Sequence, residues 1–325
     1  MVHARVLALQ RPHAVQLNAL YKAFLGGFKS SGTSSSTGLL HQQIRPSPFS
    51  CTHRNRSFRM RANCDNKVVE NQQAMRLAIL NCPGSERYDT CFKRWIGGYA
   101  DKPVEWHVFE VADGELPDFR TQFSGYIITG SKHGVYEDFP WIQRLCSWVE
   151  TAHRKKEKVL GICFGHQAVA KALGGTVMIN PAGFEIGRYR TNVSPKAVEY
   201  FKRLGTWDDA KFGADPQLTM NFVHGDYVPA DGMPPELESM GGTALSPHNG
   251  LFNRSNILTF QGHPEFITAN VLKCQEKLVE KGVLPHRLPA GADLAAVDAT
   301  LPGPVDSDWI AHTALRFFED VEPAE

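Results

Sequence analysis

A seven-residue segment at positions 161–167, Gly-Ile-Cys-Phe-Gly-His-Gln, constrains the fold of this chain more than any other feature. The apolar residues just before Cys163 predict the end of a buried strand, and residues 167–173, followed by Gly174-Gly175, predict a helix and its end. A strand that turns sharply into a helix holds its tip residue in a strained backbone conformation, and the glycines at 161 and 165 lack the Cβ atoms that would clash there. The segment therefore predicts a strand–turn–helix elbow with Cys163 at its tip.

The chemistry predicted for this elbow is nucleophilic attack. A helix N-terminus beside the Cys163 sulfur favours the thiolate, and the arrangement is a nucleophile elbow with Cys in place of Ser. A lone G-x-C-x-G pattern is weak evidence, because cysteine is often a small buried core residue. A second cluster is needed to decide between these interpretations.

That second cluster lies one hundred residues further along the chain. Residues 256–261 predict another buried strand, and Gly-His-Pro-Glu-Phe follows at 262–266. Residues two apart in extended chain point to the same side, so His263 and Glu265 can face one cleft. A carboxylate next to an imidazole fixes its tautomer, and the imidazole can then deprotonate a thiol. A strand-end histidine capped by an acid is the simpler alternative, but two such clusters at strand ends favour a Cys-His-Glu triad.

The rest of the chain from residue 75 alternates strand-like and helix-like runs, which predicts an α/β fold with a mostly parallel sheet and helices on both faces, a flavodoxin-like three-layer sandwich. Ligands bind such sheets beyond the carboxyl ends of the strands, where Cys163, His263 and the loop at Gly130 are all expected. Strands are expected at 76–80, 105–110, 125–129, 159–162, 176–179 and 256–261, with 185–193 and 218–223 near an antiparallel edge. Helices are expected at 88–99, 141–152, 167–173 and 307–318, and along a stripe of Ile267, Val271, Cys274 and Leu278, with a connector at 285–304.

These motifs resemble those of the class I glutamine amidotransferases and their hydrolase relatives. Residues 161–167 match the family's G-I-C-x-G-x-Q pattern in full, and 263–265 match its H-P-E pattern in full. Softer matches are the oxyanion-loop segment 125–131 and the substrate-side segment 223–228, so the resemblance covers about 75–266. It implies no cofactor and no metal, and a single domain of this type over 73–325.

The resemblance also implies roles for residues around the triad. The oxyanion of the reaction would lie between backbone N–H groups of Phe164 and of the Gly130 loop. Four further residues are expected to bind the substrate: Gln167, Ser131, His224 and Gly225. The family usually has two glycines and a proline in the oxyanion loop, whereas this chain has Thr-Gly-Ser-Lys at 129–132.

Because of this departure, the chain resembles the stand-alone γ-glutamyl peptidases more than typical amidotransferases. The glutaminases of GMP synthase are the other relatives that it resembles. The expected activity is hydrolysis of the γ-glutamyl amide bond of glutamine, γ-glutamyl peptides or conjugates, through a thioester. The alternatives are a glutaminase subunit that supplies ammonia to a separate synthase chain, and a non-catalytic binding protein on the same fold. The 60 residues after Glu265 are too few for a synthase domain, so any ammonia acceptor is expected on another chain.

The composition and the spacing of residue types argue against several other kinds of site and segment. The seven cysteines are widely spread with no C-x-x-C pair, and the thirteen histidines show no ligand spacing, which argues against a disulfide framework and a zinc site. No phosphate loop or dinucleotide motif is present. No apolar run approaches the ~20 residues of a membrane span. The resemblance implies a small-molecule γ-glutamyl substrate as the partner, and we expect no nucleic acid and no membrane as partners.

The N-terminal region differs from the rest of the chain in charge. Residues 1–64 contain nine Lys or Arg, eleven Ser or Thr and no Asp or Glu. An acid-free, Arg- and Ser-rich N-terminus predicts an organelle transit peptide, here over residues 1–72, and its serine tract favours the chloroplast. The alternatives are a mitochondrial or cytoplasmic location, with this segment a disordered basic tail or sequence upstream of a true start at Met75.

Overall fold

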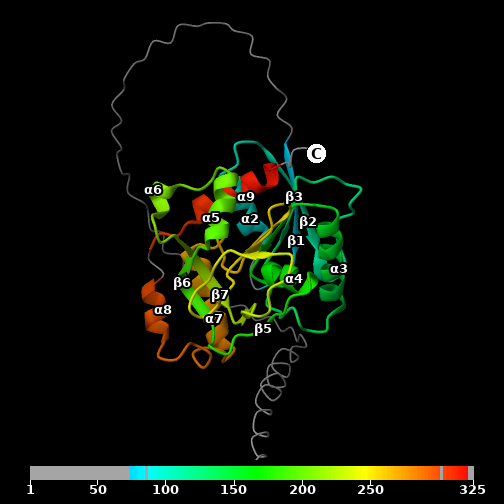
Figure 1. Ribbon diagram of the computed structural model, residues 1–325. Helices are drawn as coiled ribbons and strands as arrows, with labels where there is room; N and C mark the ends of the chain where they lie inside the picture. The colour runs from blue at the N-terminus through cyan, green and yellow to red at the C-terminus, as the bar shows by residue number, and fades with distance from the viewer. Residues whose placement is uncertain (1–73, 85–86, 301–302, 321–325) are drawn as a thin grey trace, which may run out of the picture. The chain divides into compact units, whose positions relative to one another are not determined.

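A central sheet in the order β2-β1-β3-β4-β11-β10-β9 organises the computed structural model, which describes residues 74–84, 87–300 and 303–320 (Figure 1). The first five strands of this order run parallel, and β10 and β9 extend the sheet antiparallel. The strands are β1 (Met75–Asn81), β2 (Val104–Glu110), β3 (Gly125–Ile128), β4 (Val159–Ile162), β9 (Glu238–Ser239), β10 (Leu251–Phe252) and β11 (Ile257–Phe260). The predicted mostly parallel α/β sheet is confirmed.

The central strands are buried on both faces, and successive side chains along each strand enter opposite cores. In β1, Leu77 and Ile79 pack into one apolar cluster while Ala78 and Leu80 pack into the other. This alternation follows from the two-residue repeat of extended chain. Because both faces are covered, these strands are mostly apolar in sequence rather than alternating between apolar and polar residues.

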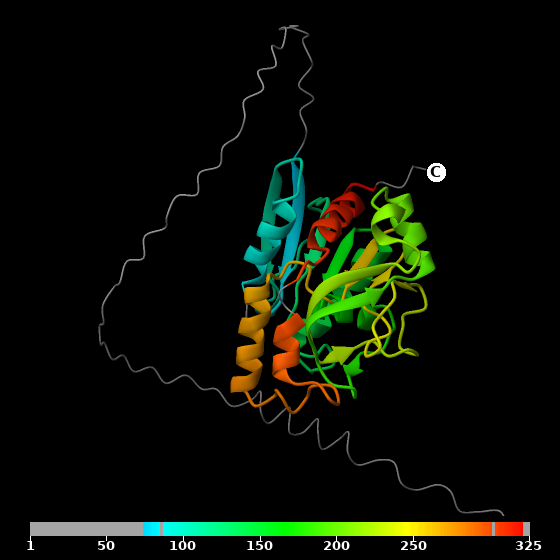
Figure 2. The ribbon, with the colours of Figure 1, turned by 90° about the vertical axis from the view of Figure 1, so that its left-hand side faces the viewer.

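Helices cover both faces of the sheet, as the three-layer prediction requires. On one face lie α3 (Pro140–Arg154) and α4 (Phe164–Ala172), and on the other lie α2 (Tyr88–Gly97) and α9 (Ser307–Glu319), which pack side by side (Figure 2). The apolar stripe of α3 that the sequence predicts is buried against the sheet. The remaining helical segments are η1 (Val111–Asp113), α5 (Pro195–Arg203), α6 (Asp209–Phe212), α7 (Thr268–Glu280) and α8 (Leu294–Thr300).

Two strands that the sequence places near an antiparallel edge form a sheet of their own. β6 (Glu185–Asn192) and β7 (Gln217–His224) pair antiparallel over their whole length and join no strand of the central sheet among the described residues. β5 (Met178–Ile179) and β8 (Asp226–Tyr227) form a second small pair. The prediction of the two strands is confirmed, and they pair antiparallel with each other and not with any described strand of the central sheet.

Three local predictions are wrong. Ile267 precedes α7 and is 54% exposed, so it does not belong to the buried stripe that contains Val271 and Cys274. The expected connector at 285–304 contains the helix α8, and the expected strand at 176–179 is reduced to Met178–Ile179. In each case a short amphipathic or apolar run was too brief for its periodicity to decide the structure.

The predicted transit peptide, residues 1–72, and the domain boundary at 73 lie outside the described residues. None of the helices that the structure describes has the length and apolar character that a membrane span requires.

Candidate active site

Cys163 lies at the elbow between β4 and α4, as its sequence context predicts. It has φ 53° and ψ −102°, a backbone conformation that non-glycine residues rarely adopt. A Cβ on Gly161 would lie 2.6 Å from the carbonyl oxygen of Gly165, and a Cβ on Gly165 would lie 2.3 Å from that of Ile128. Both glycines are therefore required for the helix to approach the sheet so closely.

The sheet topology brings the second motif to the same place. β4 and β11 are hydrogen-bonded parallel neighbours, with Ile162 opposite Phe260, and the Cys163 N–H donates to the Phe260 carbonyl at 2.8 Å. Because both strands end at the same edge of the sheet, Cys163 and His263 emerge side by side. Two motifs one hundred residues apart thus meet because their strands are adjacent.

His263 is paired with Glu265 and with the cysteine. Its Nδ1 lies 2.7 Å from Oε1 of Glu265, and the imidazole lies close enough to the Cys163 side chain for that group to raise its pKa. All three residues are buried. Burial opposes the charged imidazolium, but Glu265 and Cys163 outweigh it and raise the pKa of His263 well above its usual value. With Nδ1 on Glu265, Nε2 is the nitrogen that remains to exchange a proton with the thiol.

Two aromatic side chains hold the imidazole in place. The Phe266 ring stacks on His263 with centroids 4.2 Å apart and a 10° interplanar angle, and Tyr88 of α2 stacks at 6.4 Å and 8°. A Cβ on Gly130 would lie 3.1 Å from both His263 Cε1 and the Tyr88 hydroxyl. The predicted oxyanion loop therefore runs directly beside the imidazole.

The oxyanion loop is tied to the loop after β1. The Ser131 hydroxyl donates to the Pro83 carbonyl at 2.6 Å, and the Lys132 N–H donates to the same oxygen at 3.0 Å. The Ser131 side chain thus shapes the loop. Phe164, the other predicted oxyanion residue, is buried at the first position of α4, directly after Cys163. The oxyanion and substrate roles of these residues stay predictions.

Gln167 lies one helical turn beyond Cys163, but its amide nitrogen is used within the protein. It donates to the Asp226 carbonyl and to Oε1 of Gln261, both at 3.2 Å. These bonds hold α4 against β8 and the end of β11. To bind a substrate as predicted, this amide nitrogen would have to give up one of these two hydrogen bonds.

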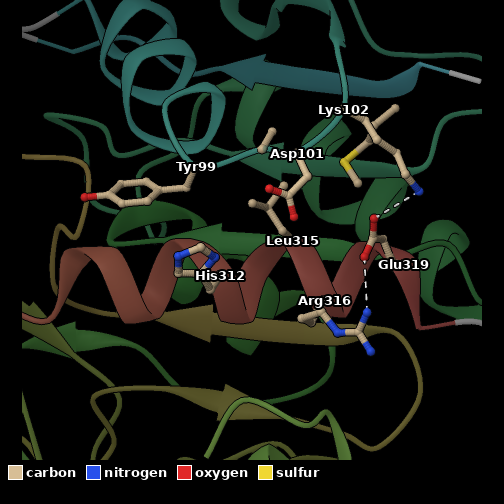
Figure 3. Close-up of a pocket in the computed structure, with 9 residues that line it drawn as sticks. Tyr99, Asp101, Lys102, His312, Leu315, Arg316 and Glu319 are labelled. Atoms are coloured by element: carbon tan, nitrogen blue, oxygen red, sulfur yellow. Dashed lines mark hydrogen bonds and ion pairs between the residues drawn. The ribbon is translucent and has the colours of Figure 1, made fainter. Parts of the chain in front are cut away.

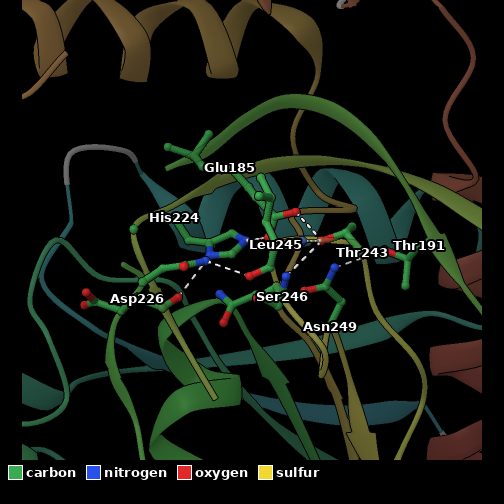
Figure 4. Close-up of polar contacts among 12 residues, drawn as sticks. Glu185, Thr191, His224, Asp226, Thr243, Leu245, Ser246 and Asn249 are labelled. Carbon is green, nitrogen blue, oxygen red and sulfur yellow. Dashed lines mark hydrogen bonds and ion pairs between the residues drawn. The ribbon is translucent and has the colours of Figure 1, made fainter. Parts of the chain in front are cut away.

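The predicted substrate-side segment lies next to the cysteine through its main chain. The Val223 carbonyl oxygen is 3.9 Å from the Cys163 sulfur. The His224 side chain is buried in a polar network instead, with Nε2 3.1 Å from Oε2 of Glu185 and Nδ1 2.9 Å from the Asp226 carbonyl (Figure 4). Gly225 contributes its carbonyl, which accepts the Asn180 N–H at 2.8 Å.

Tyr88 and Phe266 belong to the site although the sequence motifs do not predict them. Phe266 directly follows the H-P-E motif, so its position was the available signal. Tyr88 begins a helix far away in sequence, and no local pattern distinguishes it from a packing residue.

A separate small pocket of about 60 Å³ lies at the opposite edge of the sheet, between the residues before β2 and α9 (Figure 3). Met75, the first residue of β1, lines it, together with Lys102 and Arg316, which both pair with Glu319 at 3.5 Å. It contains no triad residue. Within the described residues, no three His, Cys, Asp or Glu side chains cluster in a way that could hold a metal ion.

Solved structures with the same architecture support the fold. A glutamine amidotransferase from Thermotoga maritima superposes with a TM-score of 0.54 at 19% identity, covering 75% of this chain and 96% of its own. One from Methylobacillus flagellatus superposes with a TM-score of 0.54 at 21% identity, covering 78% and 96%. At these identities the likeness concerns the fold alone.

Sequence comparison identifies the family. γ-Glutamyl peptidase 4 of Arabidopsis thaliana is 29% identical over 213 residues, covering 60% of this chain and 77% of the relative. A glutamine amidotransferase-like protein of Schizosaccharomyces pombe is 35% identical over 193 residues, covering 59% and 70%. The family model for glutamine amidotransferase class-I matches residues 107–271, a segment that contains Cys163, His263 and Glu265. This chain belongs to the class I glutamine amidotransferase family.

Proposed function

We propose that this protein is a cysteine hydrolase that cleaves the γ-glutamyl amide bond of γ-glutamyl peptides or of glutamine. The observation that carries the proposal is the buried Cys163–His263–Glu265 arrangement at the carboxyl edge of the sheet. The similarity to an Arabidopsis protein named γ-glutamyl peptidase supports the choice of bond.

In the proposed reaction, the Nε2 atom of His263 first takes the proton of the Cys163 thiol, and the resulting thiolate attacks the γ-carbonyl carbon of the substrate. Glu265 stabilises the resulting imidazolium through the 2.7 Å contact at Nδ1. The negative oxygen of the tetrahedral intermediate is held by the N–H groups of Phe164 and the Gly130 loop. His263 then returns the proton to the leaving amine, which departs and leaves a thioester.

Water completes the cycle. His263 removes a proton from the attacking water, the carbon–sulfur bond breaks, and the γ-glutamyl group leaves as a free acid with the thiol restored. The stacked Phe266 and Tyr88 rings keep the imidazole in one plane through both half-reactions.

The test is an assay of the purified full-length chain with glutamine, glutathione and a γ-glutamyl dipeptide, with glutamate release followed by mass spectrometry. We expect turnover in the absence of any other protein. Cys163→Ala should abolish it without changing the melting temperature by more than a few degrees, whereas Glu265→Ala should leave measurable residual turnover. Equal turnover in the wild type and Cys163→Ala would rule out the proposal.

A glutaminase subunit is the second candidate, because the family description names amidotransfer. In that case glutamine should be hydrolysed in preference to glutathione, and slowly unless a synthase chain is added. A kcat/KM for glutathione above that for glutamine would exclude this alternative.

A further inference from the structure

Three side chains from distant elements hold the backbone of the catalytic loop from behind. The Ser307 hydroxyl donates to the Pro264 carbonyl at 2.6 Å, and the Arg94 Nη2 donates to the Glu265 carbonyl at 3.1 Å. Asn221 Nδ2 donates to the Phe266 carbonyl at 2.9 Å. Three successive carbonyls therefore each accept one bond, from α9, α2 and β7 respectively.

A fourth bond fixes the start of the loop. The His263 N–H donates to the Asn221 carbonyl at 2.7 Å, which makes an isolated antiparallel bridge between these two residues. Asn221 thus binds the loop through both its main chain and its side chain. The loop lies between β11 and α7, where no strand ladder or helix supplies partners for these carbonyls.

One side of the loop borders a surface groove. This groove has a volume of about 360 Å³, and Arg94, Asn221 and Ser307 all line it together with residues 264–266. The side chains of His263, Glu265 and Phe266 are buried on the other side, so core packing holds that side of the loop and directional hydrogen bonds hold the side next to the groove.

We propose that Arg94, Asn221 and Ser307 are positioning residues that hold the His263–Glu265 pair in register with the Cys163 thiol. This inference rests on the proposed hydrolase function of the same site. The peptide planes of residues 264–266 set where the Glu265 carboxylate meets the imidazole. A displacement of about 1 Å at such a site can reduce a rate by ~100-fold.

The experiment compares full-length Ser307→Ala and Arg94→Met with the wild type. The conservative variants Ser307→Thr and Arg94→Lys restore a donor in each case. Arg203→Met is the matched control, because Arg203 also donates to a main-chain carbonyl, that of Arg254 at 2.9 Å, but away from the site. The kcat, the KM and the pH profile of kcat are measured for each protein with the best substrate of the panel.

We expect kcat to fall by about 10-fold or more in Ser307→Ala and Arg94→Met, with KM changed less than about 3-fold, because substrate contacts are untouched. A looser Glu265 contact stabilises the imidazolium less, so the alkaline limb of the profile should move to lower pH. The conservative variants should have a kcat and an alkaline limb close to those of the wild type. Arg203→Met should change neither quantity. A role confined to folding would not move the alkaline limb.

A wild-type kcat and an unmoved alkaline limb in both donor-deleting variants would overturn the inference, as would an equal loss in Arg203→Met. If the wild type cleaves no γ-glutamyl substrate, the proposed function fails, and the inference is then tested without substrate. The rate of Cys163 alkylation by iodoacetamide at neutral pH should be several-fold lower in Ser307→Ala and Arg94→Met than in the wild type and Arg203→Met. Equal alkylation rates in these four proteins would overturn the inference that Arg94 and Ser307 position the catalytic loop.

Discussion

At the residue scale, the candidate site depends on a conformation that only its immediate neighbours make possible. Cys163 holds a positive φ of 53° because the helix that follows begins at once and packs directly on the sheet. Such strain costs of order 1–3 kcal/mol and persists only where the surrounding structure enforces it. The elbow could be predicted from two glycines and a cysteine because this steric requirement is local.

Gly165→Ala should destabilise the protein and remove activity, because its Cβ would lie 2.3 Å from the Ile128 carbonyl oxygen. We expect a loss of about 2–4 kcal/mol in the free energy of unfolding, as for overpacked cores. The measurement is urea denaturation together with the hydrolase assay. Gly97→Ala is the control, since its Cβ would make only ordinary contact with Trp106 at 3.7 Å. Equal stability of Gly165→Ala and the wild type would contradict this account of the elbow.

The buried carboxyl of Asp226 should make the free energy of unfolding depend on pH. Burial raises the pKa of its carboxyl to about 6, although Arg287 and the hydroxyl of Tyr136 oppose the shift. Because the folded-state pKa lies above the ordinary value, this group favours folding fully below about pH 4, and that contribution is lost as the pH rises through about 6.

Asp226→Asn keeps an acceptor for Tyr136 and removes the ionisation. Its free energy of unfolding relative to the wild type should therefore rise by about 1–2 kcal/mol between pH 4.5 and pH 8. Urea denaturation of both proteins at the two pH values measures the difference. A difference that does not change with pH would show that this carboxyl does not titrate in the range.

At the scale of elements, the central strands and the helices on them could be predicted, whereas the partners of the short strands could not. Residues 159–162 are continuously apolar, and in 257–260 only Thr259 interrupts the apolar run, because both faces of these strands are buried; this is a local signal. Whether β6 and β7 join the central sheet depends on pairing over long sequence distances, for which the residues carry no such pattern. The same reason hides Arg94 and Ser307, whose hydrogen bonds reach backbone 171 and 43 residues away.

Thr259 joins three elements at the centre of the fold. Its hydroxyl oxygen accepts the Leu251 N–H at 2.8 Å and donates to the Leu251 carbonyl at 3.0 Å, and it lies 2.9 Å from Nδ1 of His166 in α4. Thr259→Val keeps the shape but leaves buried polar groups without partners. We expect a loss of about 2–3 kcal/mol in the free energy of unfolding.

The control for this variant is Thr151→Val. The Thr151 hydroxyl lies at the surface, where it donates to the Ser147 carbonyl and accepts from Arg154, both within α3. Its loss should stay within about 0.5 kcal/mol. Similar losses in the two variants, measured by urea denaturation, would show that the Thr259 hydroxyl does not connect β10, β11 and α4 as described.

At the scale of the whole molecule, the charge is divided between two parts of the chain. The basic, acid-free residues 1–64 precede a remainder in which acidic residues outnumber basic ones. We propose that residues 1–72 direct the protein to the chloroplast, on the basis of this composition. Residues 1–72 lie outside those that the structure describes.

A fluorescent protein fused to residues 1–72 should enter plastids in leaf cells and overlap with chlorophyll fluorescence. A matched fusion in which six of the Arg and Lys residues of this segment are replaced by Glu should remain outside, because import signals of this type tolerate few acids. Mitochondrial or diffuse fluorescence of the first fusion would exclude the chloroplast assignment.

The attachment of the thiol and the imidazole to adjacent strands has a practical consequence for inactivation by heat. β4 and β11 are bonded to each other in the middle of the sheet, so their ends cannot separate while the interior stays intact. Partial loosening of α5 or α6, which supply no residue of the site, would leave the pair in contact, and turnover would persist until the central sheet and the helices α2 and α9 packed on it come apart. Inactivation and global melting should therefore follow a single curve, which would make residual turnover a direct gauge of how much of the population retains its central sheet.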